Sequence, residues 1–435
     1  MKKSFFLSPL SVVAIFCFAW QVLSQTVDPA KLVRPRKVAA ANAQQSSTKV
    51  PQAPAVEQTA PVVISTDKKP ALLPLPTTAI MPAESRKITA VGPLTPTLIQ
   101  TRISEAKRLF KTRPQPTALT SPSSFIVNIA ALDQQTSHIH VVPIAKEIFL
   151  TKGSETTITS SLGEPLTVHV VRTNGVNTAL TIFNQNGNSL TPLVVEFPIE
   201  KGGAFKELAY YTSAHPALMS NDLVRSGQSY IRNMLDLAAQ RLRDKGVSIS
   251  NDLVDIAERL CVVEHVDHDR FKNENRIALY EEIYSLYALN EIDTYRYAVS
   301  SAGAGGMVQM IPWAYNLERQ RYPGVGLTPD FVTGMRNHSN ALQAMLLYMR
   351  DTWNDLSAND EVKYALNSKT ATMADIMAAG YNSNAAKLPG YLERGGENWK
   401  TLIPRETQMY LQIYKSFEAL VPIKGRSSTL AQRNE

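Results

Sequence analysis

The chain has 435 residues, more than a single hydrophobic core usually organises, so two or more structural units are expected. Its formal net charge of +7 is modest and is spread along the sequence without a block of Lys or Arg, which argues against a nucleic-acid-binding protein. Such a charge would suit an anionic polymer, but a solvated surface explains it equally well.

The first 24 residues have the pattern of an export segment. Met1 is followed by Lys2 and Lys3, and then by an apolar stretch from Phe5 to Leu23. Such a stretch is also just long enough to span a bilayer. Residues 1–24 are therefore predicted to be a signal peptide or a membrane anchor, and in either case the rest of the chain is exported.

A proline-rich stretch follows the export segment. Half of the 26 prolines lie between Pro29 and Pro116, and no Phe, Tyr or Trp occurs between Trp20 and Phe110. A segment of this kind buries too little apolar surface to form a core. Residues 25–120 are therefore predicted to be a disordered linker.

Between residues 121 and 216, short runs of Val, Ile, Thr and Phe alternate with polar residues, as in strands with one buried face. Asn186 and Gly187 stand between two such runs and tolerate the positive backbone angles of a tight turn, which predicts a hairpin. We predict that residues 121–216 form a β-rich module, a small sandwich or barrel, that serves in binding or spacing. The other clear runs are residues 138–142, 167–171 and 193–197.

From Asn221 onward, the apolar residues recur at helical spacing, and residues 217–420 are predicted to be one α-rich domain before a C-terminal tail, residues 421–435. Two predicted helices carry a carboxylate at the end of their apolar face, Glu264 and Glu291. The predicted helices begin at Asn221 and at Asn251 or Asp252, and the others span residues 273–290, 341–353 and 406–417.

Glu264 and Glu291 are candidates for acid catalysis. Cleavage of a glycosidic bond needs a carboxylic acid that is still protonated near neutral pH and can donate to the leaving oxygen. A Glu at the inner end of a helix is partly buried, and burial disfavours its charged form. For either residue alone, a structural carboxylate bonded to backbone or to an Arg explains the position as well.

The segment that follows Glu291 changes this balance. Residues 300–312, called here the signature segment, combine small residues and glycines with a Gln and a Pro. Glycines let a backbone approach a sugar closely, and a Gln amide can bond an N-acetyl or hydroxyl group. The segment resembles the signature of the soluble lytic transglycosylase family. The matching residues are Ser300, Gly303, Ala304, Gly306, Gln309 and Pro312, with Met307 and Val308 in the places of Leu and Met.

Two later stretches extend the resemblance, which covers somewhat under half of the chain. Gly380, Tyr381 and Asn382 are similar to the family's Ala-Tyr-Asn, whose Tyr orients the acid, and residues 403–410 are similar to its closing motif of Pro, Glu-Thr and Tyr. The resemblance implies a lysozyme-like domain that needs no metal or organic cofactor. The implied substrate-binding residues are Ser300, Gly306, Met307, Gln309, Tyr381 and Asn382.

The family's spacing selects between the two carboxylates. Its acid precedes the signature Ser by about nine residues, and Glu291 lies nine residues before Ser300, whereas Glu264 lies 36 before it. We therefore predict Glu291 as the acid and keep Glu264 as the second candidate. The chain departs from the family at Ile292, which replaces the Ser that follows the acid, and at Gly380, which replaces Ala.

A metal site is the main alternative chemistry in this region. His265, Asp267, His268 and Asp269 lie within five residues and are of types that bind zinc. The helical zinc-hydrolase pattern spaces two His by four residues, with a Glu beside the first, whereas here the spacing is three. We interpret the cluster as a solvated helix end and predict no metal.

The predicted fold is therefore α+β and multidomain: a linker, a β-rich module and an α-rich lysozyme-like domain. The implied activity cleaves the β-1,4 bond between N-acetylmuramic acid and N-acetylglucosamine in peptidoglycan and leaves 1,6-anhydro ends. A hydrolytic muramidase and a catalytically silent peptidoglycan-binding scaffold remain alternatives, the latter with an envelope-machine partner on the β-rich module. The expected partners are glycan strands and not nucleic acid. The expected location is the periplasm or cell envelope, free or anchored to the inner membrane.

Overall fold

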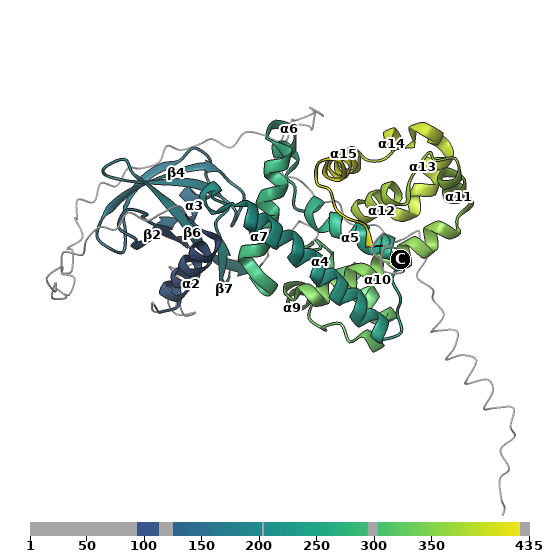
Figure 1. Ribbon diagram of the computed structural model, residues 1–435, viewed down its shortest axis with the longest axis horizontal. Helices are drawn as coiled ribbons and strands as arrows, with labels where there is room; N and C mark the ends of the chain where they lie inside the picture. The colour runs from purple at the N-terminus through teal and green to yellow at the C-terminus, as the bar shows by residue number, and fades with distance from the viewer. Residues whose placement is uncertain (1–93, 113–124, 202–203, 295–302, 427–435) are drawn as a thin grey trace, which may run out of the picture.

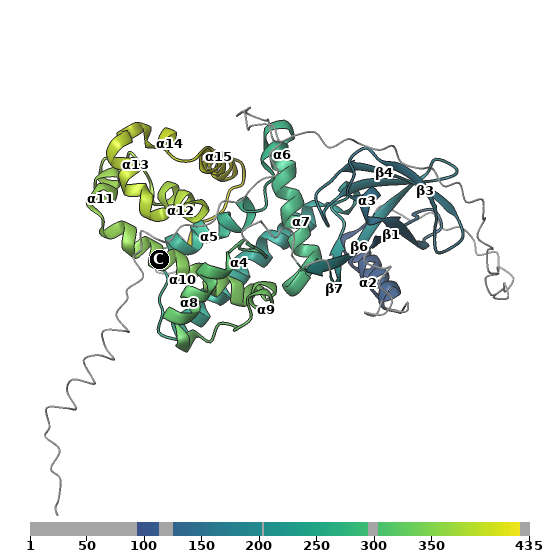
Figure 2. The same cartoon turned by 180° about the vertical axis from the view of Figure 1, so that it is seen from behind.

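The computed structural model describes residues 94–112, 125–201, 204–294 and 303–426. An antiparallel sheet lies beside an α-rich part, and helix α7 (Arg276–Thr294) stands at their junction (Figure 1 and Figure 2). This arrangement confirms the predicted α+β class. The predicted signal or anchor, most of the predicted linker and Ser300 lie outside the described residues. Within the described ranges, no helix combines the length and the apolar character that crossing a membrane requires.

Part of the stretch that we predicted to be a disordered linker is a helix, α2 (Pro96–Thr112). It packs on strand β6 (Ser189–Lys201), and the ring of Phe110 lies 5.9 Å from that of Tyr210. Pro96 is tolerated because the first position of a helix needs no N–H donor. A composition taken over the whole predicted linker conceals this one amphipathic stretch. The buried residues of α2 recur at helical spacing: Ile99, Ile103, Ala106 and Phe110.

The described part of the β-rich module is a nearly closed antiparallel sheet of seven strands, in the order β2-β1-β6-β5-β4-β3, with β7 also paired to β6. Val141 and Ser161 bridge the gap between β2 and the β3–β4 turn by two hydrogen bonds of 2.9 Å. The remaining elements of the module are β1 (Ile126–Leu132), β2 (Ile139–Ala145), α3 (Lys146–Phe149), β3 (Glu155–Thr159), β4 (Pro165–Arg172), β5 (Ala179–Asn184) and β7 (Ala204–Thr212).

The predicted hairpin at Asn186 and Gly187 is confirmed. Strands β5 and β6 pair on either side of this turn. Gly187 has a φ of +76°, and Asn184 Oδ1 accepts hydrogen bonds from the backbone N–H groups of Asn186 and Asn188. The turn therefore fixes the register of the two strands. Inward-facing residues of the strands form the core of the module, among them Val127, Ile129, Val142, Val168, Ile182 and Val195.

The β-rich module packs directly on helix α7. Asn290 accepts a hydrogen bond of 3.0 Å from the backbone N–H of Thr212, at the end of β7. The neighbouring Leu289 is buried in the same cluster as Leu193 and Val194 of β6. The C-terminal part of α7 is thereby attached to the sheet.

The predicted helices of the α-rich part are confirmed, with ends that differ from the prediction by a few residues. For example, Ser250 caps the second helix, one residue before the predicted Asn251. The helices are α4 (Asn221–Asp244), α5 (Asn251–Val263), α6 (His268–Asn273), α8 (Pro312–Arg321), α9 (Phe331–Arg336), α10 (His338–Ala358), α11 (Asp360–Asn367), α12 (Met373–Asn382), α13 (Leu388–Gly395), α14 (Trp399–Leu402) and α15 (Arg405–Leu420).

Helix α10 lies at the centre of the α-rich part, because its residues 338–349 are all buried. Helices α4 and α7 cross at close range. A Cβ atom at Gly227 of α4 would lie 1.9 Å from the carbonyl oxygen of Tyr284, so only glycine fits this crossing. Helix α7 thus packs on both α4 and β7 and joins the α-rich part to the sheet.

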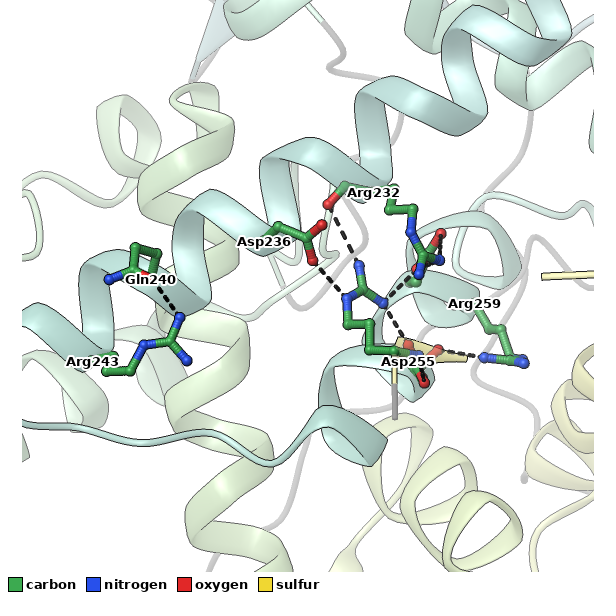
Figure 3. A network of polar contacts seen from close by, with 8 residues as sticks. Arg232, Asp236, Gln240, Arg243, Asp255 and Arg259 are labelled. Carbon is green, nitrogen blue, oxygen red and sulfur yellow. Dashed lines mark hydrogen bonds and ion pairs between the residues drawn. The ribbon is translucent and has the colours of Figure 1, made fainter. Parts of the chain in front are cut away.

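The chain after α15 returns to the middle of α5. Arg426 donates through Nη1 to Asp255 and to Glu258 of α5, and through Nε to Asp236 of α4, each over 2.6 Å. Arg232 donates to Glu258 over 3.2 Å. Figure 3 shows how Arg232 and Asp236 of α4 face Asp255 across this network. We call these residues the arginine network.

Candidate active site

Glu264 terminates helix α5 and is buried, with 7% of its surface exposed. Helices α12 and α15 pack on α5. The hydroxyl of Tyr410 on α15 donates a hydrogen bond of 2.9 Å to Glu264 Oε1. Tyr410 belongs to the predicted closing motif, residues 403–410. Two stretches that lie far apart in the sequence therefore meet at one carboxyl group.

The described part of the signature segment, residues 303–312, folds into a tight loop in which the Gly305 N–H donates to the Met310 carbonyl. Gly306 has a φ of +71°, and a Cβ atom there would lie 2.8 Å from the carbonyl oxygen of Met335. Gln309 has a φ of +46°, which is strained for a residue that is not glycine. Positive φ and close packing thus explain why Gly306 is a glycine.

Three successive carbonyl groups of the signature segment each accept a hydrogen bond from a side chain. One donor is in the segment itself, one follows Glu264 directly and one is on α12. The segment is thereby fixed both to the end of α5 and to α12. The pairs are Gln309 Nε2 with Gly306 at 2.8 Å, His265 Nε2 with Met307 at 2.9 Å, and the Tyr381 hydroxyl with Val308 at 2.7 Å.

The predicted substrate-binding residues are mostly buried. Gln309 and Tyr381 are 2% and 1% exposed, and Met307 is fully covered, while Asn382 is half-buried at the last position of α12. The hydrogen bonds of Gln309 and Tyr381 described above hold the loop. Their contact with a sugar remains a prediction, and the structure adds a role in fixing the signature segment.

Glu291 lies in the last turn of α7, where the two preceding residues, Leu289 and Asn290, pack on the β-rich module. The side chain of Glu291 lies outside the described residues, as does Ser300. The assignment of Glu291 as the acid therefore stays a prediction. Among the described residues, the signature segment is bonded to His265, which directly follows Glu264.

The His and Asp residues that resembled a metal site have separate partners. Asp267 caps α6 by accepting hydrogen bonds from the backbone N–H groups of Asp269 and Arg270, and His265 donates to Met307. In the part of the chain that the structure describes, no group of three His, Cys, Asp or Glu side chains is placed to hold a metal ion.

An aromatic cluster behind Glu264 was not predicted. Tyr287 donates to the Cys261 carbonyl over 2.9 Å, and the ring of His265 lies edge-on to Tyr287 at 6.0 Å. The Nδ1 atom of His338 lies 2.7 Å from the hydroxyl of Tyr230. Burial, assisted by the nearby His265, lowers the pKa of His338 to about 3, so its ring is neutral. The sequence showed Tyr287 only as part of an apolar stripe and gave no signal that linked it to the two His.

The arrangement contains the parts that proton transfer needs. Glu264 supplies a carboxyl group, and the neutral hydroxyl of Tyr410 can donate to it in either protonation state. The signature segment is bonded to His265, the residue that follows Glu264. Comparisons of the chain with protein-family models, with curated proteins and with solved structures found no match.

Proposed function

We propose that this protein is a peptidoglycan lytic transglycosylase with an α-rich, lysozyme-like catalytic domain, and that Glu264 is its catalytic acid. The observation that carries the proposal is the convergence of three separate motifs. Tyr410 of the closing motif donates to Glu264, and His265, the next residue, donates to Met307 of the signature segment. Tyr381 of the third motif donates to the same segment.

The proposed reaction uses one carboxyl group twice. Protonated Glu264 donates to the oxygen that links N-acetylmuramic acid to N-acetylglucosamine, and this glycosidic bond breaks. The resulting carboxylate then accepts the proton of the C6 hydroxyl while that oxygen bonds to C1, which closes a 1,6-anhydro ring. Tyr410 donates to Oε1 of this carboxyl group and so holds it in place. This route requires neither a metal nor an organic cofactor.

Glu264 as the acid implies that residues 265–299 separate the acid from the signature segment. The described part of this stretch contains α6 and α7; α7 packs against α4 and β7, and α6 packs against α7. Their packing allows Glu264 and Met307 to lie close together although about forty residues separate them. His265 then stands where the resembling family has Ser after its acid.

The test of this function is the chemistry of the products. Purified protein is incubated with peptidoglycan sacculi, and soluble fragments are analysed by mass spectrometry. Fragments with 1,6-anhydro ends are expected, and each is lighter by one water than its hydrolysed counterpart. Reducing ends would instead show a hydrolytic muramidase, and a complete lack of fragments with retained binding to sacculi would show a silent scaffold.

We further propose that the protein acts outside the cytoplasm, in the periplasm or envelope, and that the β-rich module contacts another envelope protein. The export pattern of residues 1–24 supports the location. Fractionation of cells that express the full chain tests it, because a cytoplasmic protein would have no access to glycan strands.

A further inference from the structure

His265 occupies an unusual position between the proposed acid and the signature segment. It follows Glu264 directly in the chain, and its Nε2 lies 2.9 Å from the carbonyl oxygen of Met307. A carbonyl oxygen can only accept, so Nε2 must carry a hydrogen and donate it. The bond therefore forms with the Nε2–H tautomer as well as with the protonated ring.

The ring of His265 is itself held in place. It lies edge-on to the ring of Tyr287, with an angle of 80° between the two planes. Tyr287 belongs to α7, and its hydroxyl donates to the carbonyl of Cys261 on α5. His265 thus donates to the signature segment from a setting that both α5 and α7 support.

The other two bonds to the signature segment do not reach the acid. Gln309 bonds within the loop, and Tyr381 connects the loop to α12. Of the three side chains that bond these successive carbonyls, His265 is the one adjacent to Glu264. The bond therefore ties the residue next to the proposed acid directly to the loop.

We infer that His265 is a positioning residue that fixes the signature segment relative to Glu264, an inference that rests on the proposed function. It acts through hydrogen-bond donation from Nε2 and not as a proton carrier. A misplacement of about 1 Å between reacting groups can lower turnover by about a hundredfold. Loss of this bond is therefore expected to lower kcat and to leave KM for soluble glycan strands almost unchanged.

The experiment compares His265→Leu, which lacks a donor, with His265→Gln, whose amide N–H reaches about as far as Nε2. We expect His265→Leu to lower kcat by about ten- to a hundredfold, and we expect His265→Gln to retain most of it. Amide hydrogen exchange of residues 303–312 provides a readout that does not depend on turnover. Exchange there should rise in His265→Leu and stay close to wild type in His265→Gln, and thermal melting reports whether each variant is folded.

The outcomes separate this inference from the proposed function. Full activity and unchanged exchange in folded His265→Leu would overturn the inference while the function stands. Equal loss of kcat in folded His265→Gln and His265→Leu would also overturn it, because donation alone would then be insufficient. If His265→Leu does not fold, His265→Gln decides the matter. Full activity of His265→Gln, with residues 303–312 as slow to exchange as in wild type, supports the inference, and an inactive variant refutes it. If the wild-type protein releases no fragments, the proposed function and the catalytic part of the inference are both refuted. Amide hydrogen exchange then still shows whether the bond from His265 to Met307 holds residues 303–312 in place.

Discussion

The middle of helix α5 and its C-terminal end each carry a buried glutamate, and the two glutamates have different kinds of partner. Glu258 and Glu264 lie six residues apart and are 5% and 7% exposed. Glu258 receives guanidinium groups from Arg426 and Arg232, whereas Glu264 accepts a hydrogen bond from the phenol of Tyr410. Burial raises the pKa of Glu258, and the two arginines oppose that rise. Burial alone therefore does not identify a catalytic acid, because the groups that bond a carboxyl group also affect how readily it gains or loses a proton.

The largest effect is expected from neutralising each of these glutamates in turn. Glu264→Gln should lower glycan cleavage by about a hundred- to ten-thousandfold, because an amide cannot donate and then accept the titrating proton. Its melting temperature should change little, since the amide oxygen still accepts from Tyr410. Glu258→Gln should show the reverse, with lower stability and normal turnover per folded molecule. Release of anhydro-ended fragments and thermal melting measure the two effects.

The same assay decides between the two candidate acids. Glu291→Gln should retain most of the activity, and Glu393→Gln, at an exposed position of α13, serves as the surface control. A dead Glu291→Gln beside an active Glu264→Gln would reverse the assignment and restore the acid that the sequence spacing favours. A loss of activity in both would mean that each carboxyl group takes part.

The second prediction concerns the arginine network. Arg426→Ala leaves the buried Asp255 and Glu258 with less positive charge, and breaking a buried ion pair costs about 3 kcal/mol of unfolding free energy. Arg243→Ala is the matched control, because Arg243 lies exposed on α4 and bonds only to Gln240 among the partners that Figure 3 draws. It should change stability by less than about 0.5 kcal/mol. Denaturant unfolding of both variants makes the comparison, and equal values would show that the network contributes nothing.

Local patterns in the sequence predicted much of the fold. The hairpin at Asn186 and Gly187 was predictable because the turn chemistry is local, and the helices were predictable because their buried faces repeat every three or four residues. Helix α2 has such a face, but the prolines around it dominated the composition. The extent of order in residues 96–112 therefore could not be read from an average.

The candidate site was predictable only in part, since its residues are joined by contacts that no local pattern encodes. The motifs around Gln309, Tyr381 and Tyr410 were recognised, but the hydrogen-bond partners of these side chains were not predicted. Gln309 and Tyr381 hold backbone carbonyls, and Tyr410 meets Glu264 from 146 residues away. Sequence spacing favoured Glu291 because it assumes that the acid and the signature segment are separated by the same number of residues as in the family. If Glu264 is the acid, as we propose, helices α6 and α7 lie between the acid and the signature segment, and spacing alone does not reveal them.

Glu318 on α8 offers a third case, a buried glutamate with neither an arginine nor a phenol within hydrogen-bond distance. It is fully buried, and among the described residues neither carboxyl oxygen has a hydrogen-bond partner. Arg321 approaches to 3.9 Å. Burial first, and the nearby Asp351 second, raise the pKa of Glu318 from 4.5 to about 8, against the opposing effect of Arg321. Glu318 is therefore protonated in the folded protein at neutral pH.

The smallest effect is expected from Glu318→Gln, and its sign depends on pH. Because the folded pKa is raised, the stability that the protonated acid provides is fully present below 4.5 and is lost as the pH rises to about 8. Gln does not titrate, so the variant should match wild type at about pH 5 and exceed it by about 1–2 kcal/mol at about pH 9, where local relaxation reduces the full linkage energy. Thermal melting across this range measures the difference, with Glu393→Gln as the exposed control. If the melting temperatures of wild type and Glu318→Gln change with pH in parallel, the buried carboxyl group finds a partner when it ionises. The contrast between differently partnered glutamates would then rest on Glu258 and Glu264 alone.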